Sequence, residues 1–403
     1  MPKQNIDHTD VASKRVLMRV DFNVPQDEAG NITDDRRIAL ALPSIRSAIE
    51  RGGRLVLMSH LGRPEGKGFE AEWSMRPAAQ RLGELLPGVK VALAGKDPAD
   101  DDAKRAIDAM HDGEIVVLEN LRFNKGEKKG LPEFAQRLAS FGDIYCNEAF
   151  GTAHRNDGSM FAVPQAMEGK PRVAGLLLSR ELTFLGDTLA NPKRPFVAVL
   201  GGAKVSDKIG AIDNLLARVD TILVGGAMAY TLLAAQGHAV GSSLVERDRI
   251  DDAKRIIAAA AGGRAKLLLP VDHICGKALE PGTPTMNTEG ADIDDGWMGL
   301  DIGPRTRESF VAAIKKARTI VWNGPMGAFE TRPFDAGTRH VAEAMAAATT
   351  AGAISVVGGG DSAAAVEDMG LAASFSHVST GGGASLQMLE GRAFDSVGLL
   401  DDG

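Results

Sequence analysis

Residues 196–208 read FVAVLGGAKVSDK. Five apolar residues, Phe196–Leu200, end directly on Gly201-Gly202, and a helical pattern follows. Short apolar runs that are bounded by turn residues and separated by helical stretches are typical of βαβ units, in which helices cover both faces of a parallel sheet. The stretch therefore predicts a buried parallel strand that ends in a glycine turn, and the ligand crevice of an open parallel sheet lies at such strand ends.

Nine further apolar runs repeat this arrangement along the chain. They are Val16–Val20, Leu55–Met58, Val89–Leu93, Ile115–Leu118, Ile144–Cys146, Thr221–Val224, Leu267–Leu269, Thr319–Trp322 and Ile354–Val357. The helical patterns between them include Ala41–Glu50, Ser206–Val219, Glu246–Ala261 and Asp335–Thr350. The chain is therefore predicted to be an α/β protein with two doubly wound parallel-sheet domains in series, joined by a linker helix.

The break between the two sheets is predicted near residues 170–195. Apolar residues recur at about helical spacing within Leu176–Leu189. Turn residues flank this stretch at Glu168–Pro171 and Asn191–Pro195. The pattern fits a linker helix at 173–190 between a first domain at 1–172 and a second at 191–388. It fits equally an ordinary helix that covers the first sheet.

Composition excludes several classes of protein. The 403 residues are too many for one doubly wound domain, and 44% hydrophobic with 25% charged residues is ordinary for a globular protein. A net charge of −7 gives no basic field for nucleic acid. The sequence shows no apolar signal core and no run of membrane-spanning length. Cys146 and Cys275 form no CxxC pair, which speaks against a disulfide framework or a structural zinc site. A cytoplasmic location is therefore expected, with no nucleic-acid or membrane partner.

Three strand–glycine–helix junctions in the second half predict phosphate binding. They contain Gly201-Gly202, Gly358–Asp361 and Gly381–Gly383. Adjacent glycines let the backbone approach a ligand, and the start of the next helix offers unpaired N–H groups to an anion. One such turn also serves tight packing, whereas three in one half favour a phosphate site. The common P-loop pattern GxxxxGK[ST] and the dinucleotide pattern GxGxxG are both absent.

Charged residues at these turns are candidate contacts for the phosphates. Lys204 and Lys208 lie four apart at a predicted helix start, where they would repel each other and oppose the helix dipole unless an anion lay between them. The alternative is two solvated surface lysines. Asp361 and Ser362 begin a further predicted helix, Ser362–Met369, which either side chain could cap. Asp361 could also hold Mg²⁺, which binds through one or two carboxylates plus substrate phosphates.

In the first half the strand ends carry charge instead of glycine. Four arginines follow strands there, and on one rim they would bind a small, strongly anionic molecule through bidentate contacts. They are Arg37, Arg63, Arg122 and Arg155. For any one of them the alternative is a surface salt bridge. His60 and His154 are either satisfied loop histidines or phosphate donors.

Six segments of the chain resemble those of phosphoglycerate kinases, in order and over nearly the whole length. They are Arg19–Pro25, Ser59–Pro64, Leu200–Ile209, Val321–Gly327, Gly358–Ala363 and Ser379–Ser385. The resemblance implies two six-stranded doubly wound domains, the first for phosphoglycerate and the second for nucleotide, with the C-terminal tail at 389–403 packed back on the first. It also implies reversible transfer of the acyl phosphate of 1,3-bisphosphoglycerate to ADP, giving ATP and 3-phosphoglycerate in glycolysis, by a monomer that uses Mg²⁺.

The same resemblance implies the site residues. The substrate contacts would be Asp21, Asn23, Arg37, His60, Leu61, Gly62, Arg63, Arg122 and Arg155. The nucleotide contacts would be Gly202, Lys204, Asn323, Glu330 on the ribose, Gly359, Gly360, Asp361 and Ser362. Arg37, Lys204 and Lys208 would act on the transferred phosphoryl group, and Asp361 would carry Mg²⁺. Arg36 competes closely with Arg37 for its position.

One stretch departs from the family. After His154-Arg155 the family continues with a second histidine and a small hydroxyl residue, whereas this chain has Asn156-Asp157-Gly158-Ser159-Met160 within an unusual segment at 156–170. The departure bears on the local support of Arg155 and on substrate affinity. It leaves the nucleotide motifs untouched.

The sequence also carries two other functional hypotheses. A nicotinamide dehydrogenase would use two α/β domains, but the dinucleotide pattern is missing. A two-domain solute-binding protein would close around a small anion, but the chain shows no signal peptide.

The kinase that the resemblance implies needs no activated nucleophile, because the β-phosphate of ADP is already ionised at neutral pH. The enzyme has to position the two substrates and stabilise the negative charge of the transferred phosphoryl group. If each domain holds one substrate, the domains must close to bring the substrates together and expel water.

Overall fold

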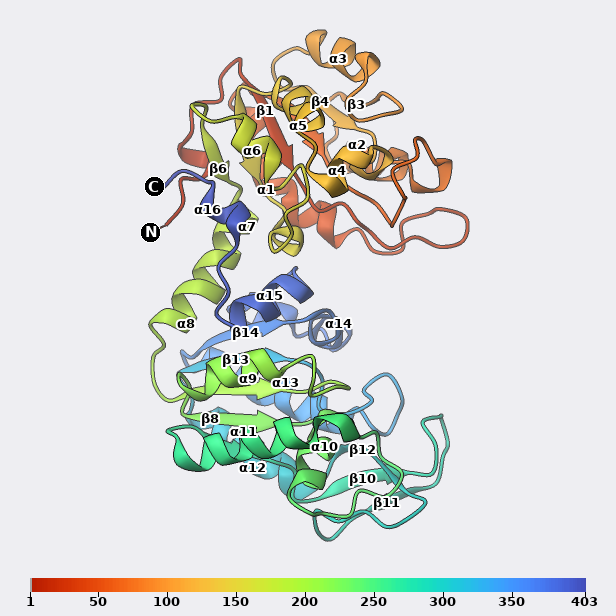
Figure 1. The fold of residues 1–403 in the computed structure, drawn as a ribbon, viewed down its shortest axis with the longest axis vertical. Coiled ribbons are helices and arrows are strands. Elements are labelled where there is room, and N and C mark those ends of the chain that lie inside the picture. The colour runs from red at the N-terminus through yellow and green to blue at the C-terminus, as the bar shows by residue number, and fades with distance from the viewer. Residues whose placement is uncertain (1) are drawn as a thin grey trace. The chain divides into compact units, whose positions relative to one another are not determined.

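The computed structural model describes residues 2–403, apart from the side chain of Asp187. The chain forms two compact units, each built on a parallel sheet flanked by helices (Figure 1). The first unit runs to Thr183 and includes Ala393–Gly403. The second unit is Phe184–Arg392. Within the described residues, no helix is both long enough and apolar enough to span a membrane.

The first unit contains a six-stranded, wholly parallel sheet in the order β3-β4-β2-β1-β5-β6. Its strands are β1 (Arg15–Arg19), β2 (Arg54–Met58), β3 (Val91–Ala94), β4 (Ile115–Leu118), β5 (Ile144–Asn147) and β6 (Arg172–Ala174). Its helices are α1 (Arg36–Glu50), α2 (Arg76–Leu85), α3 (Asp101–Asp108), α4 (Lys125–Lys129), α5 (Pro132–Ala139), α6 (Ala162–Ala166) and α7 (Leu176–Glu181). Strand β1 is central, and Val16 pairs with Leu55 on one side and Ile144 on the other.

The second unit contains a parallel sheet in the order β15-β14-β13-β7-β8-β9. Its strands are β7 (Phe196–Leu200), β8 (Thr221–Val224), β9 (Lys266–Leu268), β13 (Thr319–Asn323), β14 (Ile354–Gly358) and β15 (His377–Val378). Its main helices are α9 (Ile209–Leu216), α10 (Met228–Ala235), α11 (Ile250–Gly262), α12 (Pro304–Lys316), α13 (Ala336–Thr350), α14 (Gly360–Asp368) and α15 (Gly382–Leu389). The order reverses between β7 and β13, which is the switch point where open α/β sheets bind ligands.

The predicted fold class is confirmed, and each of the ten predicted runs overlaps a parallel strand, although Val16–Val20, Val89–Leu93 and Leu267–Leu269 extend past the strand ends. The residue pattern missed one further strand in each large sheet, because β6 has three residues and β15 has two. It also missed a small antiparallel sheet in the second unit, which orders its strands β11-β10-β12. These strands are β10 (His273–Gly276), β11 (Thr285–Asn287) and β12 (Met298–Ile302).

The segment between the units differs from the predicted single helix at 173–190. Arg172–Ala174 form strand β6, so the helical part begins only at Leu176. After α7 the chain makes a π-helical stretch, Leu182–Asp187, and then α8 (Thr188–Ala190). The boundary between the compact units falls inside this segment, after Thr183.

The C-terminal residues join the first unit from Ala393 rather than from 389. Residue 389 instead ends α15, where the Leu389 carbonyl accepts a hydrogen bond from Asn214 of the second unit (2.7 Å). Farther along, α16 (Asp395–Gly398) places the Ser396 hydroxyl 2.6 Å from the Ala153 carbonyl, to which it donates. Asp401 bonds to the backbone N–H of Arg172 through its carboxylate (2.8 Å). The tail is thus tied to Ala153 and to the start of β6.

A buried carboxylate caps the start of α7. Glu148 follows β5 and accepts hydrogen bonds from the N–H groups of Leu177 (3.1 Å) and Leu178 (3.2 Å) and from the hydroxyl of Ser44 in α1. Ser44 in turn accepts a hydrogen bond from the Leu176 N–H (2.7 Å). Burial raises the pKa of Glu148 to about 7, although these hydrogen bonds oppose the shift.

This shift predicts a pH-dependent stability. Because the pKa of Glu148 is higher in the folded state than the ordinary value of 4.5, the folded state binds more protons than the unfolded chain between that value and about 7. The free energy of unfolding should therefore fall as pH rises through this window. Glu148→Gln should remove the part of this fall that Glu148 contributes, which amounts to at most about 3.4 kcal/mol. Urea unfolding of the unaltered protein and of Glu148→Gln, repeated in steps of about half a pH unit from about pH 5 to about pH 7.5, measures the free energy of unfolding of each.

Glu168→Gln, at an exposed position of the same unit, is the matched control. Its unfolding curve should follow that of the unaltered protein at every pH. Parallel pH profiles for the unaltered chain and Glu148→Gln would contradict the prediction.

Candidate functional site

The first candidate half-site lies at the carboxyl ends of β1, β2, β4 and β5. Asp21 follows β1, and its Oδ2 accepts a hydrogen bond from Nη1 of Arg37 in the first turn of α1 (2.9 Å). The neighbouring Arg36 instead donates from Nε to Asp34 of the preceding loop (2.7 Å), and this bond lowers the pKa of Asp34. Of the two competing arginines, Arg37 therefore lies at the end of β1, whereas Arg36 bonds to Asp34 in the preceding loop.

The loop after β2 is tied to the loop after β1. Asn23 accepts a hydrogen bond at Oδ1 from the Gly62 N–H (2.8 Å). Gly62 has φ of 62°, and a Cβ at this position would lie 2.0 Å from the Trp73 ring. Only glycine therefore fits there. His60 in the same loop is buried, and burial together with the charges of Arg19 and Arg122 holds the pKa of its imidazole well below the ordinary value.

Arg122 is fixed by its neighbours and largely buried. Its Nη1 donates to the Gly62 carbonyl, and its backbone N–H donates to Oδ1 of Asn120 (3.0 Å). Asn120 also donates from Nδ2 to the carbonyls of Leu61 (2.7 Å) and Trp73 (2.9 Å). One buried amide thereby holds three segments of the half-site together, including Leu61 and Gly62 of the predicted set.

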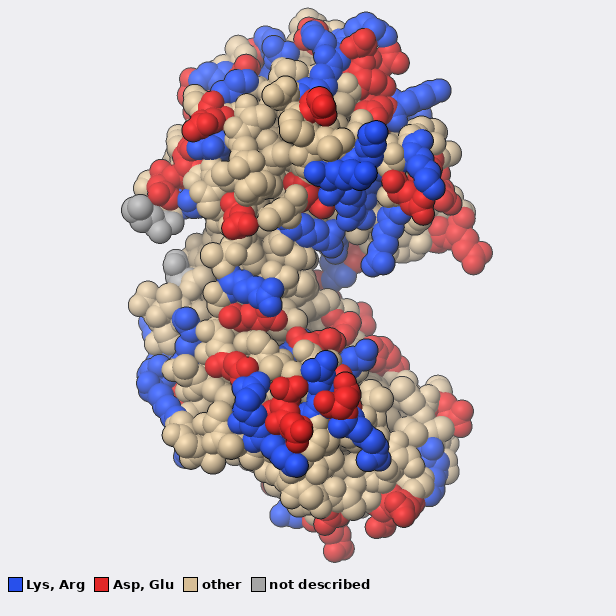
Figure 2. Space-filling view, viewed as in Figure 1, with Lys and Arg blue, Asp and Glu red and all other residues tan. Residues whose placement is uncertain are grey.

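Within the described residues, the two remaining predicted arginines of this half-site form no ion pair with an acidic side chain. Arg63 is exposed and Arg155 partly buried, and neither makes an ion pair within residues 2–403. Figure 2 shows Lys and Arg side chains gathered on the visible face of this unit over α4, whose Lys125, Lys128 and Lys129 add to the positive charge. The half-site is thus a positively charged surface that can bind an anion.

The unusual segment at 156–170 contributes directly to this region. Burial lowers the pKa of Arg122, and the charge of Asp157 opposes that shift. Asp157 also opposes the lowering of the pKa of His154 that burial and Arg155 cause. Ser159 anchors the segment, because its backbone N–H donates to Oε2 of the buried Glu127 (2.8 Å). This segment thus supplies a carboxylate beside the arginines.

Four buried polar atoms of this half-site lack a partner within the described residues. They are Asp21 Oδ1, Arg122 Nε, Asn147 Nδ2 and His154 Nδ1. Buried polar atoms in folded proteins almost always have hydrogen-bond partners. Those without one at a strand-end cluster indicate where a polar ligand binds. Asp21 Oδ1 calls for a donor such as a ligand hydroxyl, whereas Arg122 Nε calls for an anionic acceptor.

The second half-site lies at the switch point between β7 and β13. A Cβ at Gly201 would lie 2.1 Å from the Pro325 carbonyl oxygen, so the turns after the two strands pack backbone against backbone. The Gly201 N–H donates to the Asn323 carbonyl and the Gly202 N–H to the Pro325 carbonyl, both at 3.0 Å. The Gly226 N–H, after β8, donates to the Met326 carbonyl (2.8 Å). Three strand ends thus share one glycine-rich surface.

Lys208 and Asn323 meet on this surface. The Lys208 ammonium donates to Oδ1 of Asn323, whose Nδ2 is buried without a partner among the described residues. Burial lowers the pKa of Lys208, and the nearby charges of Asp207, Asp361 and Glu390 oppose that shift. One N–H of the ammonium is engaged by Asn323, so two more remain for a ligand.

The prediction that Lys204 and Lys208 share one face of a helix start is wrong. Helix α9 begins only at Ile209, so Lys204 lies in the preceding loop and is exposed. The reason is that Glu246 captures this loop, since its carboxylate accepts hydrogen bonds from the Ser206 N–H (3.0 Å) and the Ser206 hydroxyl (2.5 Å). Both lysines still follow the glycine turn after β7.

Helix α14 starts two residues before the predicted Ser362, at Gly360 after Gly359. Neither Asp361 nor Ser362 caps it. The Ser362 hydroxyl accepts a hydrogen bond from the Gly324 N–H (2.6 Å) and so joins the turns after β13 and β14. The Asp361 carboxylate is exposed in the first turn and makes no hydrogen bond to the protein within residues 2–403. Glu330 is likewise exposed, in the turn region after β13.

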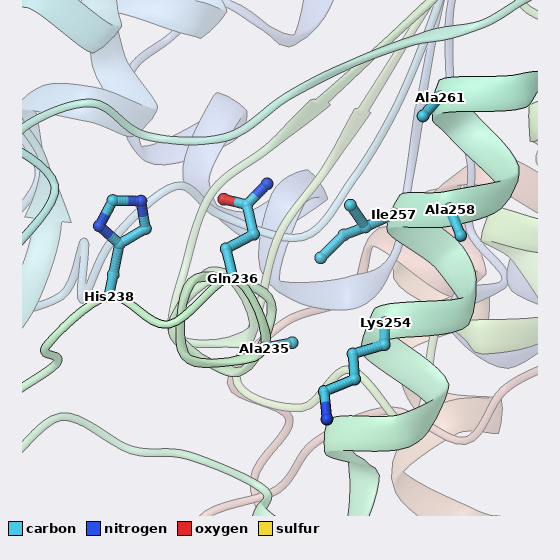
Figure 3. Close-up of a pocket in the computed structure, with 7 residues that line it drawn as sticks. All are labelled: Ala235, Gln236, His238, Lys254, Ile257, Ala258 and Ala261. Carbon is cyan, nitrogen blue, oxygen red and sulfur yellow. The ribbon is translucent and has the colours of Figure 1, made fainter.

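A separate groove of about 520 Å³ lies between α10 and α11 (Figure 3). Gln236 and His238 approach it from the end of α10, and Lys254 and Ile257 from α11. His238 pairs with Asp292 (3.0 Å). None of the predicted site residues lines this groove, so it belongs to neither half-site.

Comparisons with known proteins agree with the resemblance in the sequence. The family model of phosphoglycerate kinase matches residues 6–392. The chain belongs to the phosphoglycerate kinase family. It is 56% identical over 404 residues to a phosphoglycerate kinase of Rhodopirellula baltica and 51% identical over 402 residues to one of Chloroflexus aurantiacus, each covering 100% of both chains.

Solved structures agree in fold. The structure of phosphoglycerate kinase from Coxiella burnetii matches with a TM-score of 0.89 and 40% identity, covering 99% of this chain and 98% of that one. The phosphoglycerate kinase of Pyrococcus horikoshii matches with a TM-score of 0.83 and 31% identity, covering 98% of each. The protein is accordingly an enzyme of glycolysis that transfers the acyl phosphate of 1,3-bisphosphoglycerate to ADP and forms ATP and 3-phosphoglycerate.

Reasoning from the sequence missed the residues that hold the site together. Asn120 had a signal, since it follows β4 directly as the other polar residues follow their strands. Ser159 and Glu127 had none, because they are 32 residues apart and Arg19, which bonds to Ser159, is 140 residues from it. Such partners become neighbours only through the sheet order.

The position of Asn120 predicts a loss of stability on truncation. Asn120→Ala leaves the buried carbonyl of Leu61 and the backbone N–H of Arg122 without their partner, which should lower the free energy of unfolding by about 1–3 kcal/mol. Urea denaturation measures the change. Asn156→Ala is the control, because Asn156 is exposed and makes only a 3.3 Å bond to Asp395. Equal midpoints for the two variants would contradict the assigned role.

Proposed function

We propose that the first unit binds the phosphoglycerate and the second the nucleotide, with phosphoryl transfer between the two ligands. The observation that supports this division is the distribution of unpartnered buried polar atoms. Asp21 Oδ1 and Arg122 Nε lie among arginines in the first unit, whereas Asn323 Nδ2 lies among glycine turns in the second. A compact ligand with several negative charges and a hydroxyl suits the former, and phosphates that follow a glycine backbone suit the latter.

The proposed contacts follow from this division. Phosphoglycerate contacts Asp21, Asn23, Arg37, His60, Leu61, Gly62, Arg63, Arg122 and Arg155. The nucleotide contacts Gly202, Lys204, Asn323, Glu330 through its ribose, Gly359, Gly360, Asp361 and Ser362. These residues lie at strand ends, in the turns that follow them or in the first turn of the next helix, where an open parallel sheet binds its ligands.

The chemistry needs charge and positioning rather than a base. The attacking oxygen of the ADP β-phosphate is already ionised, and the leaving group is a carboxylate. The loose transition state spreads negative charge over the equatorial phosphoryl oxygens. Arg37, Lys204 and Lys208 donate N–H groups to those oxygens. Fixed donors of this kind stabilise the transition state more than the ground state when they are aimed at the developing charge.

The donor set of the second unit fits a magnesium ion. Mg²⁺ binds through one or two carboxylates and keeps its remaining positions for water and substrate phosphates. Asp361 supplies one exposed carboxylate beside the glycine turn, with no protein partner within residues 2–403. Mg²⁺ held there with the nucleotide phosphates would neutralise part of their charge.

The wider assignment is a cytoplasmic monomer that needs no nucleic-acid or membrane partner. The two cysteines are buried and free, which suits a reducing compartment. Each half-site is built from residues of one chain, so no second copy has to complete it. Sedimentation of the enzyme with and without its substrates measures the molar mass in solution and so tests the monomer assignment.

The metal assignment predicts a selective loss in Asp361→Ala. Affinity for Mg-ADP and turnover should both fall, because the variant lacks the carboxylate that would hold the ion. Binding of 3-phosphoglycerate should stay near normal, because its proposed contacts lie in the other unit. Calorimetric titration with each ligand and a coupled assay of ATP formation separate the two effects.

Asp368→Ala is the matched control, since Asp368 is an exposed carboxylate at the other end of the same helix, α14. It should bind Mg-ADP like the unaltered enzyme. If Asp361→Ala also did so, Asp361 would have no part in metal binding.

The transition-state assignment predicts a loss of turnover in Lys208→Ala and in Arg37→Ala. Removal of one donor aimed at transition-state charge typically costs roughly 2.7–4 kcal/mol. Turnover should therefore fall by roughly 10²–10³-fold with smaller changes in both Michaelis constants. Arg36→Ala is the control, because Arg36 pairs with Asp34 instead. A raised Michaelis constant with normal turnover would assign the altered residue to substrate binding alone.

A further inference from the structure

Arg19 is a buried cation outside the proposed set of substrate contacts. It is the last residue of β1 and has no exposed surface. Its Nε donates to the Ser159 hydroxyl (2.9 Å), its Nη1 donates to the Val20 carbonyl, and its Nη2 lies 3.0 Å from Nδ1 of His60. Three directions of the rigid guanidinium fork are thereby fixed.

A buried carboxylate balances this cation through Ser159. The Ser159 hydroxyl accepts from Arg19 and donates to Oε1 of Glu127 (2.7 Å), while the Ser159 N–H donates to Oε2 (2.8 Å). Glu127 has no exposed surface, and burial raises the pKa of its carboxyl against the opposing charge of Arg19. Glu127, Ser159, Arg19 and His60 therefore form one hydrogen-bonded chain that leads to the loop after β2.

The chemistry of arginine sets the proton on His60. A guanidinium has five N–H donors and no acceptor, so Nδ1 of His60 must accept the bond from Arg19. A protonated imidazole would point a second N–H at the cation, and the buried surroundings and nearby arginines already disfavour that form. His60 is therefore neutral with its proton on Nε2. Within residues 2–403, no protein group bonds to Nε2.

We propose that Arg19 is a positioning residue that holds His60 as the neutral Nε2–H tautomer, so that His60 offers the phosphoglycerate a hydrogen-bond donor and not a charge. The inference rests on the proposed contact between His60 and this ligand. The opposite tautomer would present a lone pair at Nε2 to an anionic oxygen, which repels it. Arg19 thus acts on the substrate through His60 without touching it.

This arrangement explains why a cation is buried at the end of β1. Placing a guanidinium in the protein interior has a large desolvation cost unless it is paired and hydrogen-bonded. Here the cost is offset by Glu127 through Ser159. The anion site itself keeps its positive charge on Arg37, Arg63, Arg122 and Arg155, while the histidine supplies direction.

The tautomer can be observed directly in the full-length enzyme labelled with ¹⁵N-histidine. Long-range proton–nitrogen correlation spectra distinguish the protonated from the accepting ring nitrogen, and His60→Gln identifies the signals of His60. The unaltered, ligand-free enzyme at neutral pH should show Nδ1 unprotonated and Nε2 protonated. Detection of Nδ1–H or of the doubly protonated ring would overturn the proposal without any variant.

Variants then test the cause. Arg19→Met should let His60 populate the other tautomer and should raise the Michaelis constant for 3-phosphoglycerate on the order of tenfold, with a smaller change for ATP. Ser159→Ala keeps the guanidinium but removes the partner of its Nε, so both effects should be smaller in this variant. It also keeps the proposal testable if Arg19→Met does not fold. Arg15→Met, which removes a partly exposed cation from the same strand, should change neither.

Addition of 3-phosphoglycerate separates the inference from the proposed function. A shift of the Nε2–H signal on addition supports the contact. If the ligand bound and the signal did not move, the contact of His60 would be wrong and the proposal with it. If the signal moved but Arg19→Met and Ser159→Ala both kept the Nε2–H form, the contact would stand and the role of Arg19 would be overturned.

Discussion

Parallel pairing of β1 with both β2 and β5 makes the carboxyl ends of these three strands neighbours at one edge of the sheet. The segments after them diverge, because each strand leads to a helix or loop on a different side, and the polar groups at the edge must find partners across the gap. Asp21, Asn23 and His60 do so by bonding to Arg37, Gly62 and Arg19. In the second unit β7 lies between β13 and β8, which brings Gly201 and Asn323 together for the same reason.

Several buried cations at one edge of a sheet require nearby carboxylates to offset their charge. Arg19 and Arg122 are both nearly removed from water, and each depresses the proton affinity of His60. Glu127, reached through Ser159, balances the first of these arginines, and the charge of Asp157 favours the protonated form of the second. The positive surface is thus supported by the buried carboxylates of Glu127 and Asp157. In this chain both Asp157 and Ser159 come from the segment at 156–170.

The sequence was sufficient for the architecture because buried parallel strands read as apolar runs, and Phe196–Leu200 and Ile115–Leu118 are strands over the predicted residues. It was insufficient where an element is short or held by distant partners. Strand β15 has only two residues, and the loop around Lys204 is non-helical because Glu246, 40 residues from Ser206, captures it. Candidate ligand contacts could be named because they follow strands directly. The bonding of Arg37, but not Arg36, to Asp21 became visible only in three dimensions.

Under the proposed division, in which the first unit binds the phosphoglycerate and the second the nucleotide, the two half-sites meet different recognition problems with different donors. A phosphoglycerate has no ring or apolar body to bury, so its affinity must come from charge and directed hydrogen bonds, and planar guanidinium groups with fixed neighbours provide both. A nucleotide offers a base and a ribose as well, so in the proposed site its phosphates would be left to backbone N–H groups, the Lys208–Asn323 pair and the Asp361 carboxylate proposed for the metal. Backbone donors cannot change rotamer, which suits a ligand that must be bound and released in every cycle. Arginine side chains can change rotamer, and for that reason the first unit needs the supporting side chains of Asn120, Ser159 and Glu127 to fix its donors.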